Sequence, residues 1–168
     1  MISKAMTEAL NEQMNFEFYS STIYLSMSAY CNHKGLDGFA SWFYNQYKEE
    51  MIHAMKMYDY ILDQGHAVEL AACPKPETDF GSALDIFETT LGHEREVTKR
   101  IYALVDLALE ERDHGTNSFL QWFVNEQVEE ESTVSSIIDK VKLVEGTGNG
   151  IFMLNNELGQ RPAPATTV

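Results

Sequence analysis

The segment His66–Gly81 reads HAVELAACPKPETDFG, and it decides how the long helices of this chain can be connected. It carries Pro74 and Pro76 and separates two stretches with helical periodicity, residues 37–65 and 82–112. An extended chain spans about 3.3 Å per residue, so these 16 residues can reach about 50 Å. Helices of this length are about 40 Å long or slightly more. The connection can therefore cross a whole helix bundle, which predicts that the helices on its two sides are parallel.

The rest of the chain also predicts an all-α fold. Apolar residues recur at spacings of three and four, and alternating β-branched runs are nearly absent. Four long helices are predicted, over residues 5–32, 37–65, 82–112 and 116–145. The turns Asn32–Gly35 and Asp113–Gly115 are short, so each joins two antiparallel helices. The expected architecture is a four-helix bundle with one long crossover between the second and third helices.

The C-terminal part is expected to add one short element. Residues 145–150 are rich in glycine, and residues 151–158 (IFMLNNEL) have one apolar face, which predicts a short fifth helix. Residues 1–158 are thus expected to form one domain. The tail GQRPAPATTV, residues 159–168, is rich in Pro and Thr and is expected to be flexible.

Composition narrows the classes of partner. The chain has 168 residues and is 44% hydrophobic, which suits one globular domain with a sizeable core. Its 26 acidic and 12 basic residues give a net charge of −14, which disfavours nucleic acid and favours cations. No run resembles a signal peptide or the roughly 18 apolar residues of a membrane span. A cytoplasmic protein with neither a nucleic-acid nor a membrane partner is expected.

Polar side chains interrupt the apolar stripe of every helix near its midpoint when the helices are written in heptads. Since the midpoints of helices of similar length lie at one height in a bundle, these side chains are expected to meet. They are Glu17 in the first helix, Glu50 and His53 in the second, Glu94 in the third, and Gln127 and Glu130 in the fourth. The two core rows of the third helix are assigned to Leu84, Leu91, Thr98 and Val105 and to Phe87, Glu94, Ile101 and Ala108. The remaining histidines, His33, His66, His93 and His114, are expected at the surface.

Four buried carboxylates without a basic neighbour point to metal binding. Burying ionised carboxylates is costly, and each raises the pKa of the others. No Lys or Arg occupies these rows, so a pair of metal ions is the simplest means of neutralising them. Glu50-Met51-Ile52-His53 forms a Glu-x-x-His motif, and mixed oxygen and nitrogen ligation suits iron. The alternative is a polar layer that only sets the register of the helices.

Three long motifs resemble the ferritins, and most closely the bacterial non-haem ferritins. They are LNEQMNFEFYSSTIYLSMSAYC (10–31), YKEEMIHAMKMYDYI (47–61) and FLQWFVNEQVEEES (119–132). The resemblance implies a ferritin-like bundle in a hollow homo-oligomeric shell of twenty-four subunits. It also implies a ferroxidase that oxidises Fe(II) with O₂ or H₂O₂ and stores ferric oxyhydroxide.

The resemblance also implies roles for individual residues. Glu17, Glu50 and His53 correspond to the ligands of a first iron, and Glu94 and Glu130 to those of a second, with Glu50 bridging. Gln127 corresponds to a hydrogen-bonding neighbour of the second iron. A third iron position corresponds to Glu49, Glu126 and Glu129 together with Glu130. Tyr24 corresponds to a hydrogen-bonding group able to supply an electron. An ordinary core tyrosine remains the alternative for Tyr24.

Two related classes remain as alternatives. Met51 lies where the bacterioferritins place a haem-ligating methionine, but Glu130 occupies the position of the histidine in a second Glu-x-x-His motif. A haem cofactor is therefore not expected. Non-storage diiron oxidases and peroxidases such as the rubrerythrins also carry two such motifs, together with a cysteine-rich domain that Cys31 and Cys73 alone do not make.

Overall fold

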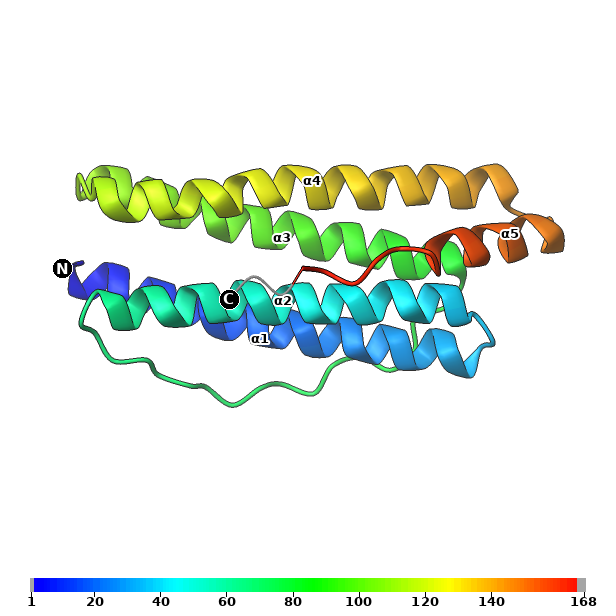
Figure 1. Ribbon diagram of the computed structural model, residues 1–168, viewed down its shortest axis with the longest axis horizontal. Coiled ribbons are helices and arrows are strands. Elements are labelled where there is room, and N and C mark those ends of the chain that lie inside the picture. Colours follow the sequence, from blue (N-terminus) through cyan, green and yellow to red (C-terminus); the bar gives the residue numbers. More distant parts are fainter. Residues whose placement is uncertain (1, 166–168) are drawn as a thin grey trace.

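The computed structural model describes residues 2–165, and within them all regular structure is helical. The elements are α1 (Lys4–His33), α2 (Asp37–Asp63), α3 (Ala83–Glu110), α4 (His114–Val144) and α5 (Gly148–Leu158). α1 and α2 lie side by side in one layer, and α3 and α4 form the other (Figure 1). The predicted four-helix bundle with a fifth short helix is confirmed, and the helix bounds differ from the predicted ones by two residues or fewer for α1 to α4.

Local signals in the sequence explain where the helices begin. The Ser3 side chain accepts a hydrogen bond of 2.9 Å from the Met6 backbone N–H at the start of α1. Ser82 and Asp85 form a capping box at the start of α3, and Asp113 accepts from the backbone of Thr116 at the start of α4. Each such cap satisfies otherwise unpaired N–H groups at the start of its helix and so stabilises the helix.

The long crossover runs outside α1 for most of the length of the bundle (Figure 1). Near its beginning, Asn11 donates to the backbone oxygen of Ala67 at 3.2 Å and accepts from the N–H of Glu69 at 2.7 Å. At its end the Tyr30 hydroxyl donates to the oxygen of Gly81 at 2.6 Å. Asn11 and Tyr30 are about 28 Å apart along a helix. The predicted parallel arrangement of α2 and α3 is therefore confirmed, with side chains of α1 supplying the partners that the crossover backbone needs.

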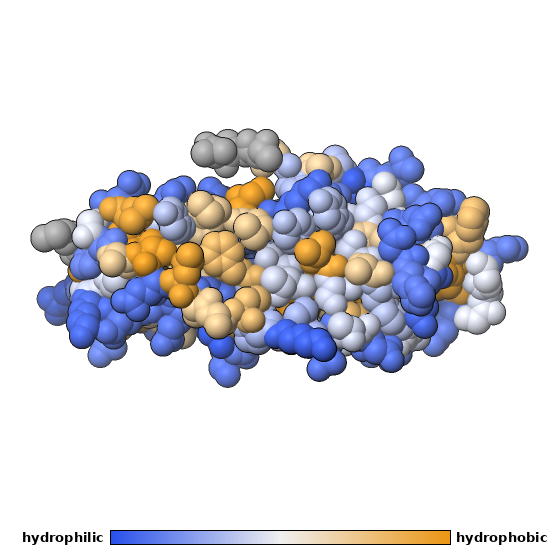
Figure 2. Space-filling model, turned by 90° about the horizontal axis from the view of Figure 1, so that it is seen from below, coloured by the Kyte–Doolittle hydropathy of each residue, from blue (hydrophilic) through white to orange (hydrophobic). Residues whose placement is uncertain are grey.

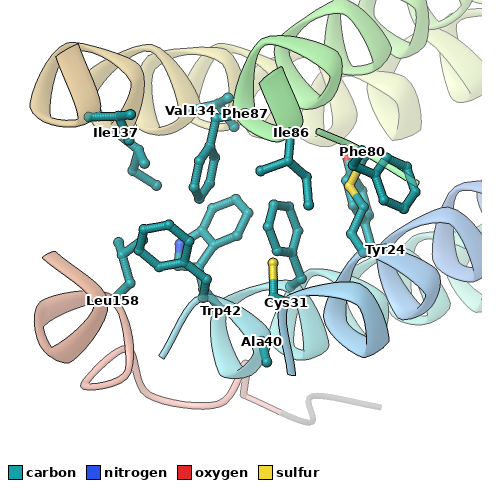
Figure 3. Close-up of a cluster of buried hydrophobic side chains, with 14 of the residues drawn as sticks. Tyr24, Cys31, Ala40, Trp42, Phe80, Ile86, Phe87, Val134, Ile137 and Leu158 are labelled. Atoms are coloured by element: carbon teal, nitrogen blue, oxygen red, sulfur yellow. The ribbon is translucent and has the colours of Figure 1, made fainter. Parts of the chain in front are cut away.

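The hydrophobic core consists of two clusters. One is rich in aromatic side chains, in which Phe39, Trp42, Phe43 and Phe87 pack ring against ring at centroid distances of 5.0 to 5.5 Å (Figure 3). The other lies towards the opposite end of the bundle and includes Met6, Leu10, Met57 and Ile101. The polar residues of the heptad seams lie between them along the helices.

One core row of α3 was assigned wrongly. Leu84, Leu91, Thr98 and Val105 are only half-buried, whereas Thr90, Val97 and Leu104 are buried beside the row of Phe87, Glu94, Ile101 and Ala108. Both flanks of that row carry apolar residues, so the spacing of three and four fits either flank. Leu84, Leu91 and Val105 instead pack at the margins of the two clusters.

α5 closes the end of the bundle that contains the aromatic cluster. Leu154 and Leu158 are buried, and Leu158 points into the cluster (Figure 3). The Asn155 side-chain oxygen accepts from the backbone N–H groups of Gly38 at 2.9 Å and Phe39 at 3.1 Å, so α5 caps the start of α2. A Cβ at Gly38 would lie 1.7 Å from the Asn155 carbonyl oxygen, and only glycine permits this approach.

Residues 159–165 follow α5 without regular structure, and Arg161 contacts α2. Flexibility of the tail stays a prediction, and its last three residues, 166–168, lie outside the described residues. Within residues 2–165, none of the helices combines the length and the apolar character that crossing a membrane requires.

Candidate metal centre

The polar residues of the four helices share one buried layer. Each presents its side chain from the core-facing row of its helix, which is why the heptad pattern located it. Their exposed fractions range from 0 to 6%, and they are Glu17, Glu50, His53, Glu94, Gln127 and Glu130. All six are therefore withdrawn from water, and their electrostatics depend on one another.

Glu17, Glu50 and His53 are the closest group. One possible ligand atom of each lies within 4.8 Å of those of the other two, and His53 Nδ1 is 3.3 Å from Glu50 Oε2. Glu17 Oε1 accepts a hydrogen bond of 2.8 Å from Gln13, but Glu17 Oε2 and Glu50 Oε2 are buried without a hydrogen-bond partner among the described residues. Buried oxygens without a partner are costly, and a cation bound between these three side chains would satisfy both.

Glu94 and Glu130 have hydrogen-bond donors of their own. The Tyr24 hydroxyl donates to Glu94 Oε1, and Gln127 Nε2 donates to Glu94 Oε2 at 3.1 Å. Glu130 Oε2 accepts from Gln46 Nε2 at 3.0 Å. The structure thus brings Tyr24 and Gln127 to Glu94, and Gln46 to Glu130.

Burial raises the pKa of all four glutamates. Desolvation is the main cause for Glu17, Glu50, Glu94 and Glu130, and neighbouring carboxylates add to it for Glu17, Glu50 and Glu130. The pKa of Glu130 rises to about 8. Without cations some of these groups hold protons near neutral pH. A metal ion would displace those protons, so metal binding is expected to release protons.

The three remaining predicted ligands lie at the margin of this layer. Glu126 is half-buried and has its pKa raised by burial, whereas Glu129 is exposed. Glu49 is half-buried, and its Oε2 accepts from Arg161 at 2.7 Å. Within residues 2–165, the tight grouping of ligand atoms is limited to Glu17, Glu50 and His53. In the structure, Glu49, Glu126 and Glu129 therefore do not form a group of ligand atoms as close as that of Glu17, Glu50 and His53.

The prediction that His93 lies at the surface is wrong. Its ring stacks on Phe16 at a centroid distance of 5.4 Å, meets Tyr24 edge-on at 5.7 Å and hydrogen-bonds Ser20 Oγ at 2.8 Å. Burial lowers the pKa of His93 to about 4, so the ring is neutral. The position lies off the heptad seam and faces α1, and nothing in the periodicity of α3 indicated this. His33 and His114 are exposed as expected, and His66 is half-buried.

Comparison with known proteins decides the family. The family model described as a ferritin-like domain matches residues 7–144. The chain belongs to the ferritin family. The bacterial non-heme ferritin of Staphylococcus aureus is 42% identical over 161 residues, which cover 96% of this chain and 97% of that one. That of Staphylococcus saprophyticus is 43% identical over 161 residues and covers 96% of each chain.

Solved ferritins have the same fold as this one. A closed form of the Archaeoglobus fulgidus ferritin, engineered by site-directed mutagenesis, superposes with a TM-score of 0.96 at 43% identity, covering 98% of this chain and 100% of that one. The open-pore ferritin of the same archaeon gives a TM-score of 0.95 at 44% identity, over 96% and 100% of the two chains. The resemblance inferred from the three motifs is confirmed over nearly the whole chain.

Proposed function

We propose that this ferritin oxidises Fe(II) to Fe(III) with O₂ or H₂O₂ inside each four-helix bundle. The product is stored as ferric oxyhydroxide within a shell of twenty-four copies in the cytoplasm. The observation that carries the proposal is the group of Glu17, Glu50 and His53, with two buried carboxylate oxygens that lack a partner among residues 2–165. Iron is the substrate here, and its ferric product is the stored cargo.

Two iron positions follow from the ligand set. Glu17, Glu50 and His53 would hold one ion, and Glu94 and Glu130 the other. Glu50 would lie between them, since Glu94 and Glu130 both raise its pKa by their proximity. Carboxylates and a neutral imidazole suit iron, and anionic oxygens stabilise Fe(III) more than Fe(II). The four carboxylates would therefore favour loss of an electron from each bound ion.

The surrounding residues donate hydrogen bonds that orient these ligands. Gln127 supports Glu94 through a neutral donor, which would leave this carboxylate free to ligate through its other lone pairs. Burial keeps the Tyr24 hydroxyl protonated by raising its pKa well above 10, so it remains a donor to Glu94. A role for Tyr24 as a source of electrons is part of the proposal and rests on this direct contact.

A third iron position is proposed at the margin, where Glu49, Glu126 and Glu129 would act with Glu130. Mutual electrostatic effects support it: Glu49 raises the pKa of Glu130, and Glu49 and Glu129 raise that of Glu126. Glu129 is exposed and Glu49 is ion-paired, so this position would require side-chain movement before iron binds.

Assembly into a shell is supported by the apolar surface of the chain. Exposed large hydrophobic residues occur on α1, α2 and the crossover, and they are Leu25, Tyr44, Met55, Leu62 and Leu70. Apolar groups gather in the left part of the face shown in Figure 2, which is the face seen from below in Figure 1. Contiguous apolar patches on a protein surface are typical of protein–protein contacts. We propose that they are covered by neighbouring copies of this chain.

The haem-containing alternative is less well supported. Met51 is half-buried, but the curated relatives at 42–43% identity carry names that specify non-heme ferritins. We propose that the protein carries iron without haem. An absorption spectrum of freshly purified protein tests this, because a Soret band would reverse the assignment.

The ferroxidase proposal is tested by Glu130→Ala and His53→Ala. Each variant is expected to slow the appearance of ferric product after addition of Fe(II) in air by at least about tenfold. Glu110→Ala and His33→Ala change exposed residues of the same types and are the matched controls. If both site variants oxidised Fe(II) at the rate of the unmodified protein, the polar layer would only set the register of the helices and would not be a ferroxidase centre.

A further inference from the structure

Arg161, in the segment after α5, folds back onto α2 beside the candidate metal centre. Its Nη2 donates to Glu49 Oε2 at 2.7 Å, and its Nη1 donates to Gln46 Oε1. The guanidinium lies over the buried Trp42 ring, 5.0 Å from its centroid, and the Arg161 backbone oxygen accepts from Asn45 at 3.2 Å. Four residues on one face of α2 therefore hold one residue of the C-terminal segment.

The guanidinium determines which way the Gln46 amide faces. Arginine has only hydrogen-bond donors, so the oxygen of the amide must face Arg161. The amide nitrogen then points the other way, where Gln46 Nε2 donates to Glu130 Oε2 at 3.0 Å. Glu130 is 6% exposed, and Gln46 is fully buried. A continuous chain of two hydrogen bonds thus runs from Arg161 to Glu130.

The same guanidinium also forms an ion pair with Glu49. Glu49 and Gln46 are three residues apart, on one face of α2, and the planar fork of the arginine spans both of them. Only 24% of the Arg161 side chain and 22% of the Glu49 side chain are exposed, so this ion pair is screened less than a surface pair. A metal ion that took Glu49 as a ligand would meet the positive charge of the guanidinium at the same carboxylate, so the arginine opposes its binding.

We propose that Arg161 is a positioning residue for iron binding: through Gln46 it directs Glu130 towards the second iron position, and through Glu49 it keeps the third position closed. The inference rests on the proposed function, because it takes Glu130 and Glu49 as iron ligands. It assigns to the C-terminal segment control over how many ions each bundle binds. Neither the heptad pattern nor the family motifs include this residue.

Three variants separate the two contacts. Arg161→Gln removes the charge and the fork, so it frees Glu49 and allows the Gln46 amide to turn. Arg161→Lys keeps a charge for Glu49 but cannot span both partners as a planar fork does. Gln46→Met has a similar volume and removes only the donor to Glu130, leaving Glu49 paired with Arg161. Lys140→Gln is the control, because it breaks the 2.5 Å pair with Glu157 of α5 and touches neither Gln46 nor Glu49.

The experiment is an anaerobic titration of the assembled, metal-free protein with Co(II), in which the visible absorption of bound Co(II) is recorded after each addition. The unmodified protein and Lys140→Gln are expected to bind two ions per chain. Arg161→Gln is expected to bind the second ion about tenfold more weakly, the effect of losing one hydrogen bond to a charged group, and to gain a third ion. Gln46→Met should weaken binding of the second ion without allowing a third ion to bind, and Arg161→Lys should behave in the same way.

Two results would overturn the inference. One is an Arg161→Gln titration that matches the unmodified protein in number and affinity. The other is a Lys140→Gln titration that changes as Arg161→Gln does, because docking of the C-terminal segment in general, and not Arg161, would then be responsible. Failure of the proposed function looks different, since the unmodified protein would then bind no Co(II) in the bundle.

Discussion

Gln127 of α4 donates a hydrogen bond of 3.1 Å from its Nε2 to Oε2 of Glu94 in α3. The same nitrogen lies 3.2 Å from the Glu94 backbone oxygen, and both side chains are buried. A neutral donor therefore stands where one further carboxylate would add to the repulsion among four glutamates. The amide thus satisfies Glu94 Oε2 without adding a fifth carboxylate to the buried layer.

Gln127→Glu is expected to destabilise the metal-free protein at neutral pH by at least about 2 kcal/mol, since it removes a donor and adds a buried carboxyl group. Adding Zn(II) should restore much of the loss. The midpoint of thermal unfolding with chelator and with Zn(II) checks both statements. Gln121→Glu, at an exposed position of α4, is the control and should change the midpoint little. A Gln127→Glu protein as stable as the control would contradict the role given to this amide.

The stability of the metal-free protein is expected to fall as pH rises from 6.5 to 8.5. The folded-state pKa values of Glu17, Glu50, Glu94 and Glu130 are raised, to about 8 for Glu130, whereas an unfolded glutamate has a pKa of about 4.3. In this window the folded state thus binds more protons than the unfolded state, and raising the pH favours unfolding. Unfolding midpoints measured with chelator test the direction. A midpoint that rises with pH over this window would be inconsistent with burial of uncompensated carboxyl groups.

Below pH 6.5 the half-buried His93 is expected to act in the opposite direction. Its folded-state pKa is lowered to about 4 from an ordinary value of about 6.5, so the unfolded state binds the proton first and acid destabilises the fold. His93→Phe removes this effect and keeps the stacking on Phe16. The unfolding midpoint of the variant should therefore rise relative to that of the unmodified protein as pH falls from 6.5 to 4. A constant difference between the two proteins would show that His93 does not titrate in this range.

The close approach of α5 to α2 predicts an effect for Gly38→Ala. The added Cβ would meet the Asn155 carbonyl oxygen at 1.7 Å, so α5 must move and the two hydrogen bonds that cap α2 are lost. We expect a destabilisation of about 2 kcal/mol or more, measured by urea unfolding. Gly92→Ala is the matched control, because no atom lies within 4 Å of its added Cβ and alanine favours the helix by about 1 kcal/mol. Equal stability changes in both variants would rule out the docking contact as the cause.

Much of this fold could be predicted because apolar residues spaced three and four apart indicate helices with one buried face. The heptad rows located Glu17, Glu50, Glu94 and Glu130 in the core, since each falls on a seam whose other members are apolar. The length of segment 66–81 was enough to fix the parallel pair of helices. These inferences needed only the pitch of a helix and the reach of an extended chain.

The features that periodicity could not predict come from contacts between distant segments. The half-buried row of Leu84, Leu91 and Val105 has the same spacing as the buried one, so only packing distinguishes them. His93 is held by Phe16 and Ser20 of another helix. Arg161 comes from a segment whose composition predicts flexibility, yet it pairs with a residue 112 positions away. Single-sequence patterns carry no signal for such pairs.

Binding of two iron ions between the four helices is tested most directly by anomalous diffraction at the iron edge, from crystals soaked anaerobically with Fe(II). We expect two peaks in each chain, one contacting Glu17, Glu50 and His53 and one contacting Glu50, Glu94 and Glu130. Iron peaks found elsewhere on the chain, with none inside the bundle, would contradict the proposed centre.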